Sequence, residues 1–179
     1  MTIIIWDIDG VLNPYLANDL AERNFFHISK NWMTVDIDLQ DHAAWMRDLE
    51  SKSTMVWGSS WEDDSNLIAD YFWLTKHLDY IKFRGVTHGE DITWKLPSVI
   101  KFVDTVKEPI IWLDDEFKQD AYDWAEKRGN TKLIYCDPAV GWTFEQYQQI
   151  LEFIEEHKHK TLANITPKHP ILFKRKKSQ

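Results

Sequence analysis

The stretch Ile3-Ile4-Ile5-Trp6-Asp7-Ile8-Asp9-Gly10 decides how the rest of this chain is interpreted. Four apolar residues run directly into two carboxylates and a glycine, which is typical of a buried strand that ends in a functional loop. Asp and Gly are also common in plain turns, but two carboxylates spaced i, i+2 repel each other at a strand end. A magnesium site that handles phosphate requires such a pair. Asp7 and Asp9 are therefore the first candidate site residues.

Short apolar runs alternate with helical patterns along the remainder of the chain. Strands are predicted at 2–6, 54–57, 79–83, 110–113 and 131–135, and helices at 40–51, 62–76, 97–107, 116–128 and 143–157. This alternation favours an α/β fold in which a five-stranded parallel sheet lies between two layers of helices. Two more strands, at 24–28 and 33–37, are expected to form a hairpin within a small insert at about 14–39.

Composition narrows the class of protein. The 179 residues fit one domain, and the 44% of apolar residues are enough for a core. Cys136 is the single cysteine, which excludes a disulfide within the chain and fits a reducing compartment. No run approaches the ~20 apolar residues of a membrane span, and Asp7 and Asp9 interrupt the apolar N-terminal run. A soluble cytoplasmic protein without a signal peptide is expected.

Charge is distributed unevenly. Residues 158–179 contain seven Lys or Arg and no Asp or Glu, so their formal charge is +7. Residues 1–157 therefore carry −15, and the two parts give the total of −8. We expect one domain over 1–157 followed by a basic tail at 158–179. The tail is either a solvated terminus or a segment that follows a phosphate backbone.

The predicted strand ends bring several polar residues to one edge of the sheet. In parallel sheets, ligands bind beyond the carboxyl ends of the strands. Ser59 and Ser60 follow the second strand, Asp114 and Asp115 follow the fourth, and Lys95 stands where a loop enters a helix. These residue types suit phosphoryl transfer: a carboxylate nucleophile, a carboxylic acid, oxygen ligands for Mg²⁺, and a cation and hydroxyl that hold phosphoryl oxygens.

The order of these residues resembles the four motifs of the haloacid dehalogenase-like (HAD) superfamily, over residues 3 to about 157. The motifs are Asp7-x-Asp9-Gly10-Val11-Leu12, Ser59 after an apolar strand, Lys95 before a helix, and Asp114-Asp115 after another strand. Further segments are similar to a small HAD group associated with RNA-repair proteins and their phage or bacterial relatives. They are Val56-Trp57-Gly58-Ser59-Ser60-Trp61-Glu62-Asp63-Asp64-Ser65-Asn66, Trp94-Lys95-Leu96-Pro97, Trp112-Leu113-Asp114-Asp115-Glu116 and Asp137-Pro138-Ala139-Val140-Gly141-Trp142-Thr143.

The resemblance implies a role for each motif residue. Asp7 would be the nucleophile, and Asp9 the general acid and base. Asp114, helped by Asp115, would bind Mg²⁺ together with Asp7 and the backbone carbonyl of Asp9. The phosphoryl group would be held by Ser59 or Ser60 and by Lys95. Val11 stands where many members have Thr, which argues against the phosphoprotein-phosphatase branch.

The expected function is that of a Mg²⁺-dependent phosphatase with a HAD-like three-layer sandwich and a minimal cap. Its expected substrate is a phosphorylated nucleic-acid end or a nucleotide, which is implied mainly by the resemblance to the RNA-repair group. The tryptophans that flank the motifs, the open rim left by a small cap and the basic tail favour the same substrate. The alternatives are a small-molecule phosphatase acting on mononucleotides or sugar phosphates, and a catalytically silent HAD domain that binds a partner. Fold analogy alone does not decide among them.

Several residues keep two interpretations each. Ser59 is preferred as the phosphate ligand and Ser60 as a helix cap, although both fit a capping box. Asp115 is either a metal ligand or a cap. Lys95 is distinguished from other lysines only by the motif order. Trp61 and Trp94 flank motifs, so either could stack on a base, although core or rim packing is preferred.

Overall fold

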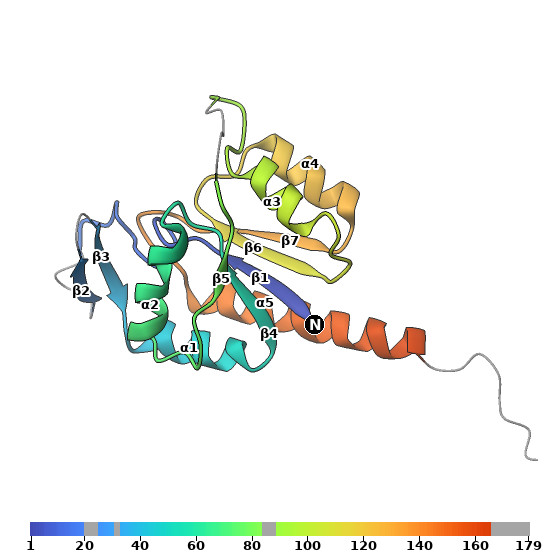
Figure 1. The fold of residues 1–179 in the computed structure, drawn as a ribbon, viewed down its shortest axis with the longest axis horizontal. Helices are drawn as coiled ribbons and strands as arrows, with labels where there is room; N and C mark the ends of the chain where they lie inside the picture. Colours follow the sequence, from blue (N-terminus) through green and yellow to red (C-terminus); the bar gives the residue numbers. More distant parts are fainter. Residues whose placement is uncertain (20–24, 31–32, 84–88, 166–179) are drawn as a thin grey trace, which may run out of the picture.

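The computed structural model describes residues 1–19, 25–30, 33–83 and 89–165, which form an α/β sandwich (Figure 1). Its centre is a five-stranded, entirely parallel sheet with the order β5-β4-β1-β6-β7. The strands are β1 (Thr2–Trp6), β4 (Ser53–Trp57), β5 (Asp79–Tyr80), β6 (Ile110–Asp114) and β7 (Thr131–Tyr135). The prediction of a five-stranded parallel sheet is therefore confirmed, with β5 shorter than the 79–83 expected.

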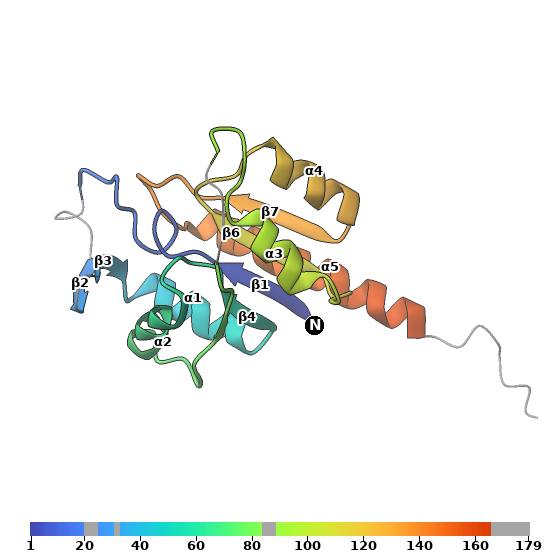
Figure 2. The ribbon, with the colours of Figure 1, turned by 45° about the horizontal axis from the view of Figure 1, so that its top comes forward.

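Helices cover both faces of the sheet (Figures 1 and 2). They are α1 (Asp41–Glu50), the 3₁₀ turn η2 (Glu62–Ser65), α2 (Asn66–Tyr71), α3 (Leu96–Val103), α4 (Gln119–Arg128) and α5 (Phe144–Ile165). Side chains of β1 alternate between the layers: Ile5 packs with α3 and α4, whereas Ile4 and Trp6 pack with α1, α2 and α5. This two-sided burial explains the unbroken apolar run of β1, since a strand covered on both faces has no polar side.

The helix boundaries differ from the predicted ones for local reasons. The helix predicted at 62–76 is a 3₁₀ turn followed by the six-residue α2, and Trp73, beyond its end, lies in the left-handed region at φ 52°. The helix predicted at 116–128 begins three residues later, because the backbone of Lys118 is extended at φ −109° and ψ 177°, with its N donating to Thr93 Oγ1. α5 reaches Ile165, so the first residues of the predicted 158–179 tail belong to it. Residues 166–179 lie outside the described part.

The insert after β1 contains the predicted hairpin. β2 (Phe25–Lys30) and β3 (Met33–Asp38) are antiparallel and form a separate two-stranded sheet. Ile28, Val35 and Ile37 of the hairpin join the buried cluster that includes α1. Figures 1 and 2 place the hairpin beyond the carboxyl end of β1, the same end at which Asp7 lies.

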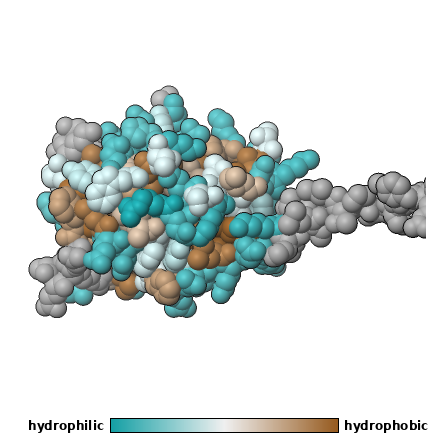
Figure 3. Space-filling model, turned by 90° about the horizontal axis from the view of Figure 1, so that it is seen from below, coloured by the Kyte–Doolittle hydropathy of each residue, from teal (hydrophilic) through white to brown (hydrophobic). Residues whose placement is uncertain are grey.

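The surface is predominantly polar on the face drawn in Figure 3, where apolar residues form separate areas. Isolated exposed apolar side chains of this kind are common on protein surfaces. Within the described residues, none of the helices combines the length and the apolar character that a membrane span requires.

Candidate functional site

The register of the sheet brings the predicted motifs together. Trp6 pairs with Trp57 of β4 and with Leu113 of β6, so these three strands end at the same level. Asp7, the next residue after β1, therefore lies beside Asp114, the last residue of β6. Asp7 is 4% exposed, and its Oδ1 accepts a hydrogen bond of 2.8 Å from Ile8 N.

Lys95 connects these two carboxylates. It is the residue that precedes α3, and its Nζ donates to Asp7 Oδ2 and, over 2.8 Å, to Asp114 Oδ2. The side chain is buried, whereas Lys82 and Lys101 are exposed. Lys95 is therefore the lysine at the strand ends, as the motif order predicts.

The loop that carries Lys95 is fixed to the start of α4. Thr93 donates from its N and Oγ1 to Asp120, and its Oγ1 accepts a hydrogen bond of 2.7 Å from Lys118 N. These contacts are partly buried, so they restrict the loop two residues before Lys95. The position of the Lys95 ammonium group is therefore fixed by these contacts as well as by its ion pairs with Asp7 and Asp114.

Three carboxylates form a compact cluster. One oxygen each of Asp7, Asp114 and Asp115 lies within 4.8 Å of the others. Asp114 is fully buried, and its oxygens accept hydrogen bonds from Trp112 Nε1 and Glu116 N at 3.1 Å each. Burial and the charge of Asp114 raise the pKa of Asp7 to about 7, despite the opposing effect of Lys95.

The same burial acts on the other members of the cluster. It raises the pKa of Asp114 and, together with the charge of Asp7, that of Asp115. Burial alone would lower the pKa of Lys95, but Asp114 and Asp7 outweigh it and raise that pKa. Lys95 is thus a permanent cation facing three carboxylates. When all are ionised, two negative charges are uncompensated, and the oxygen donors fit a hard divalent cation such as Mg²⁺.

Asp115 belongs to this cluster and is not a helix cap. α4 begins after Lys118, and Asp115 Oδ2 accepts a hydrogen bond of 3.1 Å from Tyr15 Oη. Burial and the neighbouring carboxylate raise the pKa of Tyr15 to about 12, so its phenol keeps the proton that it donates. Gly10 has a φ of 77°, and a Cβ there would overlap the Asp115 carboxyl group. The glycine of the first motif therefore makes room for the third carboxylate.

Asp9 lies apart from the cluster and is held by two neutral donors. Asn13 Nδ2 donates to Asp9 Oδ1 over 2.8 Å, and Trp61 Nε1 donates to Asp9 Oδ2 over 2.9 Å. Trp61 is 6% exposed, which excludes its stacking on a base and fits the preferred packing role. Trp94 is half-buried and packs edge-on against Phe83 with ring centroids 5.3 Å apart.

The two serines differ in exposure, and the prediction that Ser60 caps the following helix is wrong. Ser59 is fully buried and accepts a hydrogen bond of 3.4 Å from Trp61 N. Ser60 is exposed and lines the opening above Asp7. Neither residue caps the following turn with its side chain, because Trp61 is the residue that precedes η2 and no cap bond forms there. Ser60 is thus the serine that a ligand in the opening meets first.

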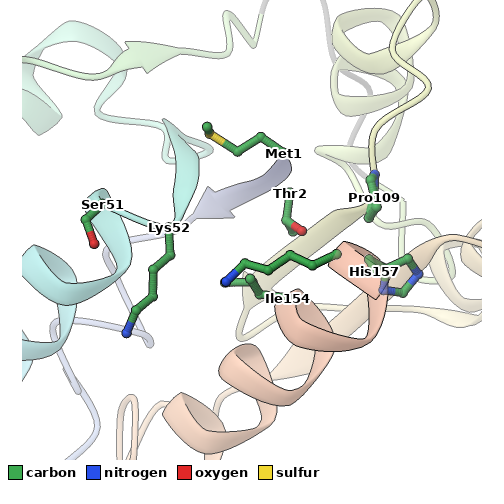
Figure 4. A pocket seen from close by; sticks show the side chains of 8 residues that line it. Met1, Thr2, Ser51, Lys52, Pro109, Ile154 and His157 are labelled. Carbon is green, nitrogen blue, oxygen red and sulfur yellow. The ribbon is translucent and has the colours of Figure 1, made fainter. Parts of the chain in front are cut away.

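An opening of about 320 Å³ gives access to the site. It is lined by Asp7, Asp9, Tyr15, Ser60, Trp94, Lys95, Asp115 and Glu116. A larger cavity of about 440 Å³ lies at the opposite end of the sheet, where Lys52 precedes β4 and His157 stands on α5 (Figure 4). Its described lining residues include no carboxylate. Chemistry, rather than size, therefore identifies the smaller opening as the candidate site.

Three contacts of the site escaped the sequence analysis. Asn13 and Tyr15 were not selected, and the hydrogen bond from Trp61 to Asp9 was not foreseen. The short spacing of Asn13 and Tyr15 from Asp9 was the available signal. Trp61 gave no comparable signal, because its partner lies 52 residues away.

Comparison with known proteins gave no match, whether with protein-family models, curated proteins or solved structures.

The raised pKa of Asp7 predicts a pH-dependent effect of Mg²⁺ on stability. In the metal-free protein the folded state binds a proton on Asp7 that the unfolded state releases, so this group's contribution to stability falls as pH rises from about 4 to 7. Mg²⁺ replaces that proton, and at pH 8 there is none to displace. We therefore expect Mg²⁺ to raise Tm more at pH 8 than at pH 5.5.

The measurement is a thermal melt with and without Mg²⁺ at both pH values. Asp115→Asn should reduce the Mg²⁺-induced rise in Tm, whereas Asp70→Asn, which alters an exposed aspartate paired with His77, should not. An equal rise at both pH values would contradict the prediction.

Proposed function

We propose that this protein is a Mg²⁺-dependent phosphatase of the HAD type that acts through an aspartyl-phosphate on Asp7. The observation that carries the proposal is the buried cluster of Asp7, Asp114 and Asp115 around Lys95, at the carboxyl end of the central strand. The strand order β5-β4-β1-β6-β7 is the one that the resemblance to the HAD superfamily implies, and it supports the same proposal.

The reaction follows from the positions of the two first-motif aspartates. An Asp7 carboxylate oxygen attacks phosphorus, and the bond between phosphorus and the leaving oxygen breaks. Asp9, which lines the same opening, gives its proton to that oxygen. Asp9 then takes a proton from water, whose oxygen attacks phosphorus and displaces Asp7, so that inorganic phosphate leaves and the carboxylate is restored.

The remaining residues bind and orient. Asp7, Asp114 and Asp115 would hold Mg²⁺, which supplies positive charge next to the phosphoryl oxygens when bound. Lys95, which contacts Asp7, supplies a second positive charge. The hydroxyl of Ser60 or Ser59, in the loop after β4, donates a hydrogen bond to a phosphoryl oxygen. The β2–β3 hairpin, beyond the same strand ends, would limit the access of water.

The lining of the opening favours a terminal phosphate. Lys95 is the single lysine or arginine among the described residues that line it. Four acidic residues line it as well, namely Asp7, Asp9, Asp115 and Glu116. Such a wall repels a long run of internal phosphates and accepts one phosphoryl group together with Mg²⁺. Tyr15 and Trp94 add two aromatic rings at the same opening, which suits a nucleotide as the group that bears the phosphate.

Phosphate release with Mg²⁺ across a substrate panel tests the proposal. The panel contains 3′- and 5′-phosphorylated RNA and DNA oligomers, mononucleotides, sugar phosphates, a phosphopeptide and an aryl phosphate. We expect release from nucleotide substrates to exceed that from the phosphopeptide at least about tenfold. Release from sugar phosphates alone would favour the small-molecule alternative. No Asp7-dependent release from any substrate would overturn the phosphatase proposal and favour a partner-binding domain.

A further inference from the structure

Asp9 stands out within the opening because both of its carboxylate oxygens are already engaged. Asn13 Nδ2 donates to Oδ1 and Trp61 Nε1 donates to Oδ2, at 2.8 and 2.9 Å. Both donors are nearly buried, with Asn13 at 5% and Trp61 at 6% exposure. Two donors from different parts of the chain fix the plane of a carboxyl group, which a single hydrogen bond does not do.

Each donor is itself fixed. Asn13 Oδ1 accepts a hydrogen bond of 3.2 Å from Asp36 N on β3, and the backbone of Asn13 closes the turn with Gly10 N and Ile8 O. Trp61 is the residue that precedes η2. Glu62, the first residue of η2, has a φ of 49°, and its Oε1 accepts a hydrogen bond from Phe83 N. A non-glycine residue in that region costs about 1 kcal/mol or more, and such strain is retained where geometry matters.

We propose that Asn13 and Trp61 are positioning residues that orient the Asp9 carboxyl group toward the leaving oxygen. Asn13 also links the orientation of Asp9 to the β2–β3 hairpin through its hydrogen bond with Asp36 N. This inference rests on the proposed function, because it assigns a task to Asp9 in that reaction. Neither residue is a catalytic residue, since neither touches the reacting atoms. Each acts by restricting the rotation of Asp9, so that its proton meets the oxygen that leaves.

The leaving group provides a test that a merely structural role would not satisfy. An alkoxide leaves only when it is protonated, whereas 4-nitrophenolate leaves readily without a proton. An Asp9 carboxyl group in the wrong orientation therefore lowers kcat/KM for an alkyl phosphate far more than for 4-nitrophenyl phosphate. General acids contribute about 10²- to 10⁴-fold to rates, so a misaimed one should lose about tenfold or more.

Trp61→Phe removes the indole N–H and keeps an aromatic ring. We expect it to lower kcat/KM for glycerol phosphate at least about tenfold and that for 4-nitrophenyl phosphate less than about threefold. Asn13→Ala should give the same pattern. Trp142→Phe is the matched control, because Trp142 is a buried tryptophan whose Nε1 has no partner among the described residues. Trp142→Phe should change kcat/KM for both substrates by the same factor.

The possible results separate the two proposals. Equal losses for both substrates in Trp61→Phe and Asn13→Ala, in an active wild-type enzyme, would overturn the positioning role and leave the phosphatase proposal intact. A wild-type protein that releases no phosphate in an Asp7-dependent manner from these two esters or from any nucleotide substrate of the panel would overturn both. The Mg²⁺-induced rise in Tm should be the same in both variants as in the wild type, since neither residue belongs to the carboxylate cluster.

Discussion

Replacing Asp7 by Asn should lower Mg²⁺-dependent phosphate release at least about 10³-fold while changing Tm of the metal-free protein by no more than about 3 °C. The amide cannot attack phosphorus, so the aspartyl-phosphate does not form. Stability changes little because two effects oppose each other. The substitution removes one buried charge from a cluster with two uncompensated negative charges, and it loses one of the acceptors that serve Ile8 N and Lys95 Nζ.

Phosphate release and a thermal melt on the same preparation check this expectation. Asp70→Asn, the same substitution at an exposed aspartate, should retain wild-type activity. An active Asp7→Asn variant would exclude Asp7 as the nucleophile. Loss of activity together with a fall in Tm of about 10 °C would indicate lost structure instead.

Replacing Lys95 by Met should destabilise the metal-free protein by about 3–5 kcal/mol near pH 7. Met has a similar length but no charge, so Asp7 and Asp114 would remain buried without their cation. For a chain of this size the loss corresponds to a fall in Tm of about 10 °C or more. The fall should be smaller at pH 5.5, because the pKa values of both carboxyl groups are raised and protons then replace the missing charge. Mg²⁺ should restore part of the loss.

Lys101→Met is the control, since Lys101 stands on α3, the helix that Lys95 precedes, and is exposed. It should change stability by less than about 0.5 kcal/mol. A Lys95→Met variant as stable as Lys101→Met would mean that Lys95 does not compensate the carboxylates.

The backbone of the site could be predicted from the sequence because it depends on strand ends. An apolar run such as Ile3–Trp6 predicts a buried strand, and parallel pairing brings the residues that follow the strands to one edge. Asp7 and Asp114 were located in this way, whereas Lys95, which precedes α3, was selected only through the motif order. Helix boundaries were less accessible, since contacts between segments, such as Lys118 N with Thr93 Oγ1, shift them.

The support of Asp9 could not be predicted for a different reason. Whether Trp61 reaches Asp9 depends on the conformation of the loop after β4, and Glu62 adopts a backbone region that its residue type does not favour. The same loop leaves Ser60 exposed and Ser59 buried, which the residue pattern did not specify. Residue patterns therefore predict helices and strands better than they predict the conformation of the loops between them.

The central position of β1 also has a consequence for biosynthesis. Ile3 pairs with Thr54 and with Ile110, so its second neighbour is translated more than a hundred residues later. At ~5–20 residues per second, the ribosome needs about 5 to 20 s to deliver β6 after β1. During that interval one long edge of a strongly apolar strand lacks its native partner, which is the situation in which nascent chains associate with one another or recruit chaperones. The carboxylates of Asp7 and Asp114 meet only when this wait ends, so the growing chain does not experience their repulsion until β6 joins the sheet.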